Sequence, residues 1–107
     1  MAPEALTWVD VGPADLLPGE CRTAEARHMN VALFNVNGTW HALENVCTHD
    51  GGELAGGAFE GTVVTCPRHG AQFDVITGKA LCFPAVTPAP VLPVRVDNGR
   101  VLVALPD

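Results

Sequence analysis

Two short loops, each offering one cysteine and one histidine, constrain this chain more than any other feature of its sequence. The first loop reads Cys47-Thr48-His49-Asp50-Gly51-Gly52, and the second reads Cys66-Pro67-Arg68-His69-Gly70-Ala71. Sixteen residues separate His49 from Cys66, which gives the pattern C-x-H-x16-C-x-x-H. Thiolates and imidazoles are common ligands of metals. We therefore expect a fold that brings both loops to one metal centre, with Cys47, His49, Cys66 and His69 as the candidate ligands.

Two other interpretations of these four residues stay open. Structural zinc also takes two thiolates and two imidazoles, but zinc loops usually place about two to four residues between paired ligands. The single residue between Cys47 and His49 is shorter than that spacing. In a site without metal, the cysteines would be small core residues and the histidines surface groups. That interpretation leaves the mirrored loops and their flanking glycines to coincidence.

The rest of the sequence indicates an all-β domain. Hydrophobic residues make up 48% of the 107 residues and charged residues 17%, which is a globular composition. Eleven glycines and nine prolines predict many turns between short strands. No segment shows a sustained helical period. We expect residues 1–107 to form one domain, since its length is near the commonest domain size.

Two β-hairpins are the clearest local predictions. Residues 31–36 and 39–43 are apolar segments joined by Asn37-Gly38, a pair that favours the two-residue turn with positive φ. A second hairpin is expected from residues 94–96 and 101–105, which turn at Asp97-Asn98-Gly99-Arg100. Further strands are expected at 6–11, 21–25, 62–65 and 72–75, with turns at 56–61 and 77–79.

Several motifs beyond the ligand loops carry a family resemblance that extends over nearly the whole chain. They are a tryptophan-containing hairpin before C-T-H, the C-P-x-H-G-x-x-F-D loop, a T-G-K turn, and a proline-rich stretch leading to P-V-R-V. Together they resemble the Rieske ferredoxins. The chain is most similar to the electron-carrier ferredoxins of bacterial aromatic-ring-hydroxylating dioxygenases, such as the biphenyl and carbazole systems.

The resemblance implies a cofactor and a fold. Rieske proteins hold a [2Fe-2S] cluster in which two histidines replace two cysteines on one iron. The resemblance therefore assigns Cys47 and Cys66 to one iron, and His49 and His69 to the other. It implies a Rieske fold, in which an antiparallel β-sheet framework carries an inserted cluster-binding subdomain at about residues 45–80. The segment Phe83-Pro84-Ala85 is expected to pack against the cluster as a third loop.

The same resemblance suggests where the reduction potential lies. High-potential Rieske proteins have a disulfide between the ligand loops and two hydroxyl groups that donate hydrogen bonds to sulfur. Gly52 and Arg68 occupy the disulfide positions here, and Ala71 and Phe73 occupy the hydroxyl positions. Hydrogen bonds to sulfur raise the potential. We expect the potential at the low end of the Rieske range, near about −150 mV.

Charge and hydropathy restrict the partners. The net charge is −6 and Lys79 is the single lysine, which argues against binding of nucleic acid or of an anionic membrane. The N-terminus has no secretion signal, and no apolar stretch is long enough to span a membrane. We therefore expect a cytoplasmic protein. In that reducing compartment Cys21 and Cys82 are expected to be free, buried thiols.

The implied function is electron transfer without bond chemistry in this chain. The resemblance implies one electron at a time from a flavin-containing NADH:ferredoxin reductase to a terminal Rieske non-haem iron oxygenase of aromatic degradation. The docking tip is expected at the ligand histidines with Asp50, Arg68 and Pro84. Its acidic surroundings are expected to come from Glu44, Glu53 and Glu60. The alternative is a Rieske-like small subunit of a nitrite reductase or another oxidoreductase complex.

Overall fold

A computed structural model describes residues 6–27, 29–46, 53–67, 70–83 and 87–106. These residues form strands and turns and contain no helix, so the all-β prediction is confirmed. The strands are β1 Leu6–Pro13, β2 Cys21–Ala26, β3 Met29–Val36, β4 Thr39–Glu44, β5 Phe59–Glu60, β6 Val63–Thr65, β7 Gln72–Asp74, β8 Ala80–Cys82, β9 Val91–Leu92, β10 Val94–Asp97 and β11 Arg100–Pro106. None of the described segments is a helix that could span a membrane.

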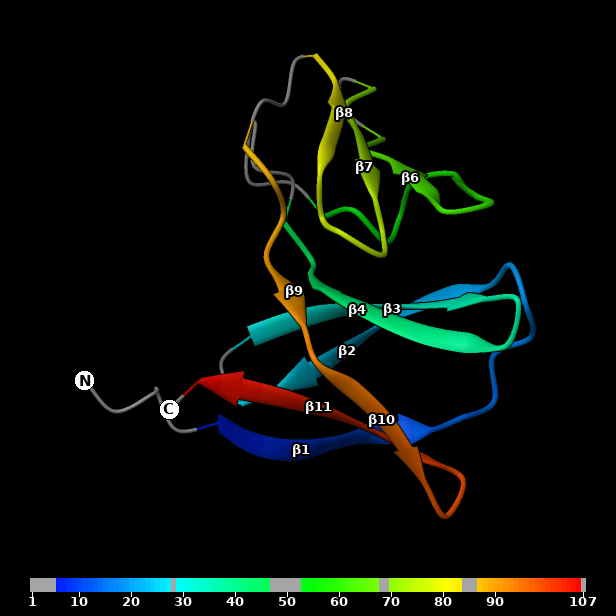
Figure 1. Cartoon of the computed structure of the whole chain (residues 1–107), viewed down its shortest axis with the longest axis vertical. Helices are drawn as coiled ribbons and strands as arrows, with labels where there is room; N and C mark the ends of the chain where they lie inside the picture. Colours follow the sequence, from blue (N-terminus) through cyan, green and yellow to red (C-terminus); the bar gives the residue numbers. More distant parts are fainter. Residues whose placement is uncertain (1–5, 28, 47–52, 68–69, 84–86, 107) are drawn as a thin grey trace.

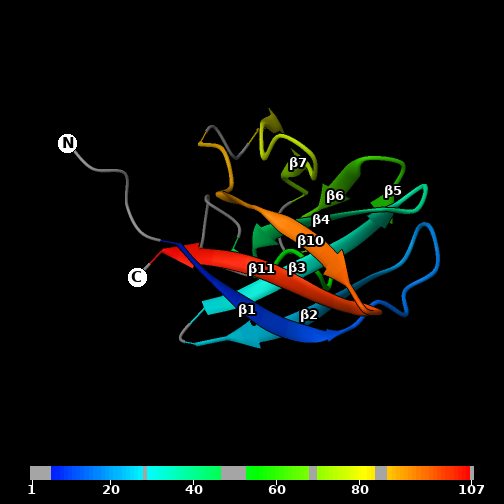
Figure 2. The same ribbon diagram turned by 60° about the horizontal axis from the view of Figure 1, so that its bottom comes forward.

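The strands are arranged in three antiparallel sheets (Figure 1). The outer sheet has the order β1-β11-β10, the middle sheet has the order β2-β3-β4-β9, and the small sheet has the order β5-β6-β7-β8. Figure 1 shows the small sheet above the middle sheet and the outer sheet below it. Figure 2 shows β11 and β1 crossing in front of β2 and β3, so the outer and middle sheets form two layers.

Strand β3 of the middle sheet is buried on both faces. Its residues Val31 and Leu33 join a lower core against the outer sheet, whereas Ala32 and Phe34 join an upper core against the small sheet. All four are fully buried. Successive residues of a strand point to opposite faces. A strand between two cores is therefore apolar throughout, and this is why residues 31–34 do not alternate with polar ones.

The two predicted Asn-Gly hairpins are confirmed. Asn37 and Gly38 have φ of 52° and 92° between β3 and β4, and Asn98 and Gly99 have φ of 50° and 74° between β10 and β11. Positive φ at both central residues belongs to the turn whose twist suits adjacent strands. Val36 pairs with Thr39, and Asp97 pairs with Arg100, so each loop has two residues.

The small sheet contains elements that the sequence patterns did not predict. Residues 56–61 were expected as a turn, but Phe59–Glu60 within them is strand β5. Strand β8 of the small sheet was also not expected, and neither was strand β9 of the middle sheet. At Gly57 a side chain would overlap the carbonyl oxygen of Thr65, so glycine is required where this segment approaches β6. The rings of Phe59 and Phe34 pack edge to face with centroids 4.9 Å apart, joining the small sheet to the middle sheet.

Candidate metal centre

The second ligand loop is the tip of the hairpin between β6 and β7. Cys66 follows β6 directly, and its amide donates to the carbonyl of Ala71 at 2.7 Å. The amide of Gly70 donates back to the carbonyl of Cys66 at 3.1 Å, with a φ of 77° at Gly70. Glycine adopts such a φ without steric cost. These two bonds close the loop and hold Cys66 at its base.

Cys66 is the one predicted ligand among the described residues; Cys47, His49 and His69 lie outside them. Its side chain is buried and belongs to the upper core with Val64, Ala71 and Phe73. Ala71 and Phe73, expected at the two hydroxyl positions, are fully buried beside it. The disulfide positions Gly52 and Arg68 lie outside the described residues. The surroundings of Cys66 are thus apolar, and neither Ala71 nor Phe73 can donate a side-chain hydrogen bond to sulfur.

The described residues on either side of the first ligand loop are joined by Asn45. Asn45 follows β4, and its amide donates to the carbonyl of Asn30 at 2.9 Å, which extends the pairing of β3 with β4. Beyond the loop, the amides of Leu54 and Ala55 donate to Asn45 Oδ1 at 2.8 and 2.9 Å. One buried side chain therefore joins the two ends of residues 46–53. Asn45 was not predicted as a site residue, although it stands two residues before the candidate ligand Cys47.

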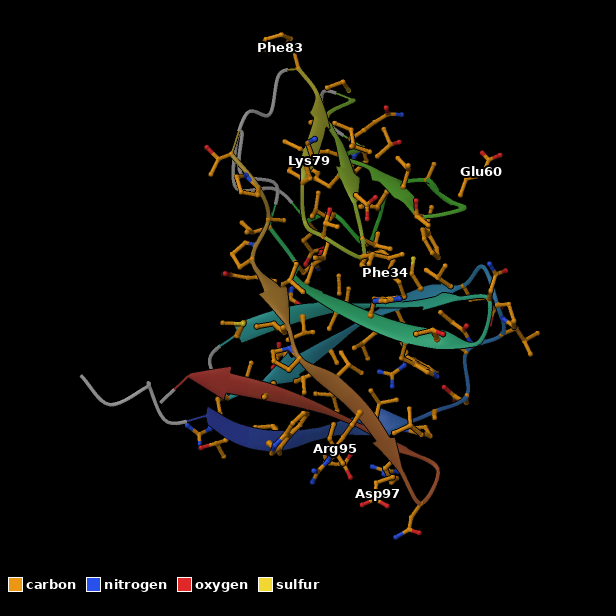
Figure 3. All side chains as sticks on the ribbon, in the orientation of Figure 1. Phe34, Glu60, Lys79, Phe83, Arg95 and Asp97 are labelled. Atoms are coloured by element: carbon orange, nitrogen blue, oxygen red, sulfur yellow. The ribbon has the colours of Figure 1, made fainter. Side chains whose placement is uncertain are left out.

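Strand β8 places a third segment beside the second loop. Gln72 of β7 pairs with Cys82 of β8, and Cys82 Sγ lies 3.6 Å from the carbonyl oxygen of Gly70. Phe83, expected to pack against the cluster, has a side chain that is 82% exposed, and Figure 3 shows it projecting from the end of the molecule. Contact between Phe83 and the cluster stays a prediction, and Pro84 and Ala85 lie outside the described residues.

The remaining cysteines in the described part of the chain are free thiols, as expected, but they are not both buried. Cys21 is half-buried and its thiol donates to the carbonyl of Ala55 at 3.6 Å. Burial raises the pKa of Cys21, which disfavours the thiolate that a metal requires. Cys82 is exposed. The prediction of burial is therefore wrong for Cys82, which lies on the edge strand of the small sheet.

The described residues fit a Rieske cluster in two respects. Cys66 supplies a thiol at the base of a loop, inside an apolar core that would limit access of water to the metal. Asn45 is 4% exposed, and its Nδ2 has no acceptor among the residues that the structure describes. A buried donor usually has a hydrogen-bond partner. Asn45 stands two residues before the candidate ligand Cys47, so a cluster bound there would be a suitable acceptor. When bound, the cluster accepts and releases one electron.

Comparison with known proteins identifies the family. The Rieske [2Fe-2S] domain family matches residues 7–95. The ferredoxin component of the naphthalene 1,2-dioxygenase system of Pseudomonas putida is 36% identical over 99 residues, which cover 92% of this chain and 95% of that protein.

Solved structures agree with that assignment. A chain in the complex of reduced oxygenase and oxidized ferredoxin of carbazole 1,9a-dioxygenase superposes with a TM-score of 0.86 and 35% identity, covering 91% of this chain and 92% of its own. A putative NADH-dependent nitrite reductase small subunit from Mycobacterium tuberculosis superposes with a TM-score of 0.83 and 28% identity, covering 97% and 99%. This chain belongs to the Rieske [2Fe-2S] domain family and holds a Rieske-type [2Fe-2S] cluster.

Proposed function

We propose that this protein is the ferredoxin of an aromatic-ring-hydroxylating dioxygenase system and carries single electrons to the terminal oxygenase. The observation that supports this most is the match over 95% of the length of the naphthalene dioxygenase ferredoxin component. That relative is named as the ferredoxin component of a dioxygenase system, in which the chemistry on the aromatic ring belongs to the oxygenase. The proposed electron donor is a flavin-containing NADH reductase, and the proposed compartment is the cytoplasm, where NADH is available.

The ligand set is part of the proposal. Cys47 and Cys66 bind one iron, and His49 and His69 bind the other, within a subdomain of about residues 45–80. The position of Cys66 at the base of the closed β6–β7 loop supports this assignment. Replacing any of the four with alanine should abolish the cluster, whereas Cys21→Ala and Cys82→Ala should keep it. Iron and acid-labile sulfide analysis decides this, and a full cluster in Cys66→Ala would overturn the ligand set.

We place the docking surface at the end of the small sheet that carries the second loop. Leu81 and Phe83 are apolar yet 44% and 82% exposed, and they flank Cys82 beside Gly70. Exposed apolar side chains that border a redox centre suit a small, transient interface. The predicted tip residues Asp50, Arg68 and Pro84 lie outside the described residues. Of the acidic residues, Glu53 and Glu60 are exposed, and Glu60 lies on β5, at the sheet edge opposite β8 (Figure 3).

Stopped-flow electron transfer tests the proposed function. The reductase and oxygenase components of the naphthalene 1,2-dioxygenase system serve as donor and acceptor. We expect this protein to be reduced by the reductase with NADH and reoxidised by the oxygenase. Phe83→Ala should slow reoxidation, while Val96→Ala, which truncates a 48% exposed apolar side chain on the outer sheet, should not. Failure of both reductase and oxygenase to react with the loaded protein would contradict the proposal.

Charge steering is tested in the same assay. Neutralising Glu53 and Asp50 should slow transfer without changing the visible spectrum, and salt should slow the wild type, since screening acts over about 8–10 Å. Electron-transfer rates that change with neither the substitutions nor the salt concentration would show that the contact is chiefly apolar, with Phe83 as its main side chain.

The second candidate function is a small subunit of a nitrite reductase, and the structural match to such a subunit favours it. A permanent subunit should co-purify with its large partner, whereas a carrier should remain monomeric and exchange between partners. Neighbouring genes also separate the two candidates. Oxygenase and ring-cleavage genes would support the carrier, and a sirohaem reductase gene would support the subunit.

A further inference from the structure

Asn45 is one of two equally buried asparagines in the described chain, and the two differ in their hydrogen bonds. Asn35 and Asn45 are each 4% exposed. Asn35 uses both ends of its amide, since Nδ2 donates to the carbonyl of Leu16 at 2.8 Å and Oδ1 accepts from the amide of Gly38 at 2.7 Å. Asn45 uses Oδ1 twice, but its Nδ2 finds no acceptor among the described residues.

An unpaired buried N–H group is costly. A buried donor without an acceptor loses its hydrogen bonds to water and gains none in return, so folded proteins rarely retain one without a reason. The acceptor end of Asn45 fixes the direction of its amide, because two backbone donors, from Leu54 and Ala55, hold Oδ1 in place. The amide cannot turn over without placing Nδ2 against these two N–H groups. Nδ2 of Asn45 therefore points away from Leu54 and Ala55 and can donate only to a group on the opposite side of the amide.

We propose that Asn45 is a positioning residue for the cluster: Oδ1 closes the first ligand loop, and Nδ2 donates a hydrogen bond to the electron-rich sulfur of the cluster assembly. Asn45 stands two residues before Cys47, and its Oδ1 binds the segment by which the same loop returns to the core. A hydrogen bond to sulfur strengthens as the cluster gains negative charge. Asn45 therefore favours the reduced state as well as retention of the metal.

Neighbouring contacts show that the closing of the loop depends on Asn45 in particular. Asn30 Nδ2 donates to Glu53 Oε1 at 3.0 Å, but that bond is exposed. Exposed polar contacts contribute little because water replaces them readily. The bonds to Asn45 Oδ1 are buried at Leu54, where water is excluded. Removal of Asn30 should therefore leave the loop closed, whereas removal of Asn45 should open it.

The inference rests on the proposed role of Cys47 and His49, and the variants separate the two. Three variants are compared: Asn45→Ala, Asn35→Ala and Asn30→Ala. Iron content, the rate of cluster release to a chelator and the reduction potential are measured under conditions in which the same fraction of each variant is folded. We expect Asn45→Ala to release the cluster about tenfold faster. We also expect its reduction equilibrium to shift about tenfold toward the oxidised state, equal to about 59 mV for one electron. Asn35→Ala should lose stability with neither change, and Asn30→Ala should resemble the wild type.

Asn45→Asp is the second variant, because it keeps an acceptor for Leu54 and Ala55 but has no N–H donor. It should retain the cluster near the wild-type rate and still shift toward the oxidised state. An unchanged reduction equilibrium in Asn45→Asp, or equal effects of Asn45→Ala and Asn35→Ala, would overturn the inference. A full cluster in Cys47→Ala would instead overturn the ligand assignment and leave the loop-closing measurement on Asn45 to stand by itself.

Discussion

The two halves of this molecule differ in the length of their strands. The lower half, where the outer and middle sheets enclose the lower core, has long strands: β1 and β3 have eight residues each and β11 has seven. The small sheet has strands of two or three residues. Its loops depend on individual polar contacts, such as Asn45 Oδ1 and the Asp74 carboxylate that accepts from the amides of Ile76 and Thr77.

The difference in strand length indicates how each half is stabilised. Long paired strands over an apolar core are stable by themselves, whereas short strands need tertiary support. Metal binding couples to folding because the ligands are gathered only in the folded state. We infer that the lower half is a framework that forms without cofactor, and that the small sheet gains much of its stability from the cluster.

Removal of the cluster should have the largest effect and would test the comparison directly. After chelation of the iron under reducing conditions, amides of β6 and β7 should lose most of their protection from hydrogen exchange, while amides of β3 and β11 keep theirs. Hydrogen exchange with residue resolution measures this. Equal loss of protection in both halves, or no loss in the small sheet, would contradict the inference that the small sheet alone depends on the cluster.

A pair of leucine truncations should show the next largest effect. Leu33 is fully buried in the lower core and Leu54 in the upper core. Each Leu→Ala change should lower the free energy of unfolding by about 2–5 kcal/mol through lost contacts and a cavity. Leu33→Ala should keep a full cluster at room temperature, but Leu54→Ala should also lose iron faster. Urea unfolding and visible absorbance report both quantities, and identical iron loss in the two variants would contradict the division.

Added hydroxyl groups should have a smaller effect, confined to the potential. Ala71→Ser and Phe73→Tyr place hydroxyls beside Cys66, and each should raise the reduction potential by on the order of tens of millivolts. Phe34→Tyr is the control, since Phe34 is equally buried in the upper core but lies on β3. It should lower stability and leave the potential unchanged. Protein-film voltammetry measures all three, and unchanged potentials in Ala71→Ser and Phe73→Tyr would show that backbone contacts control the site.

The smallest effect should come from an ion pair at the far end of the framework. Arg100 donates one hydrogen bond to each carboxylate oxygen of Asp10, both at 3.0 Å. These bonds, together with one from the amide of Gly12, lower the pKa of Asp10. A lowered folded-state pKa stabilises the protein above the ordinary value of 3.8 and loses that contribution as pH falls through the folded value. Asp10→Asn should therefore flatten the acid side of the pH–stability profile slightly. Asp97→Asn is the control, and cluster content should not change in either variant.

Local chemistry made some of this structure predictable and left other parts hidden. The Asn37-Gly38 and Asn98-Gly99 turns were predictable because positive φ requires those residue types. Strand β9 was not, because it has two residues between prolines and exists through pairing with Ala42 and Leu43 of β4. Phe59 stands among glycines that indicate a turn, yet its ring packs on Phe34 and holds it in β5.

The four ligands of the site stay a prediction, and one residue that supports the first ligand loop, Asn45, was not predicted. The spacing of the cysteines and histidines, together with the surrounding motifs, predicted the family, and the family match over residues 7–95 confirms it. Asn45 was not identified, because its importance lies in contacts with Leu54 and Ala55 across the loop. Phe83 was expected beside the cluster, and its side chain is exposed because it follows the edge strand β8 of the small sheet. The bonds of Asn45 with Leu54 and Ala55 are tertiary contacts, which no local sequence pattern specifies.

A reductive titration followed by electron paramagnetic resonance, on protein with measured iron and sulfide, tests the central claim most directly. A Rieske electron carrier should contain about two irons and two acid-labile sulfides per chain and take up one electron. Its reduced form should give an anisotropic signal with a low average g, and its potential should lie near the low end of the range, about −150 mV. Stoichiometric zinc without sulfide, or no signal after reduction, would contradict the account.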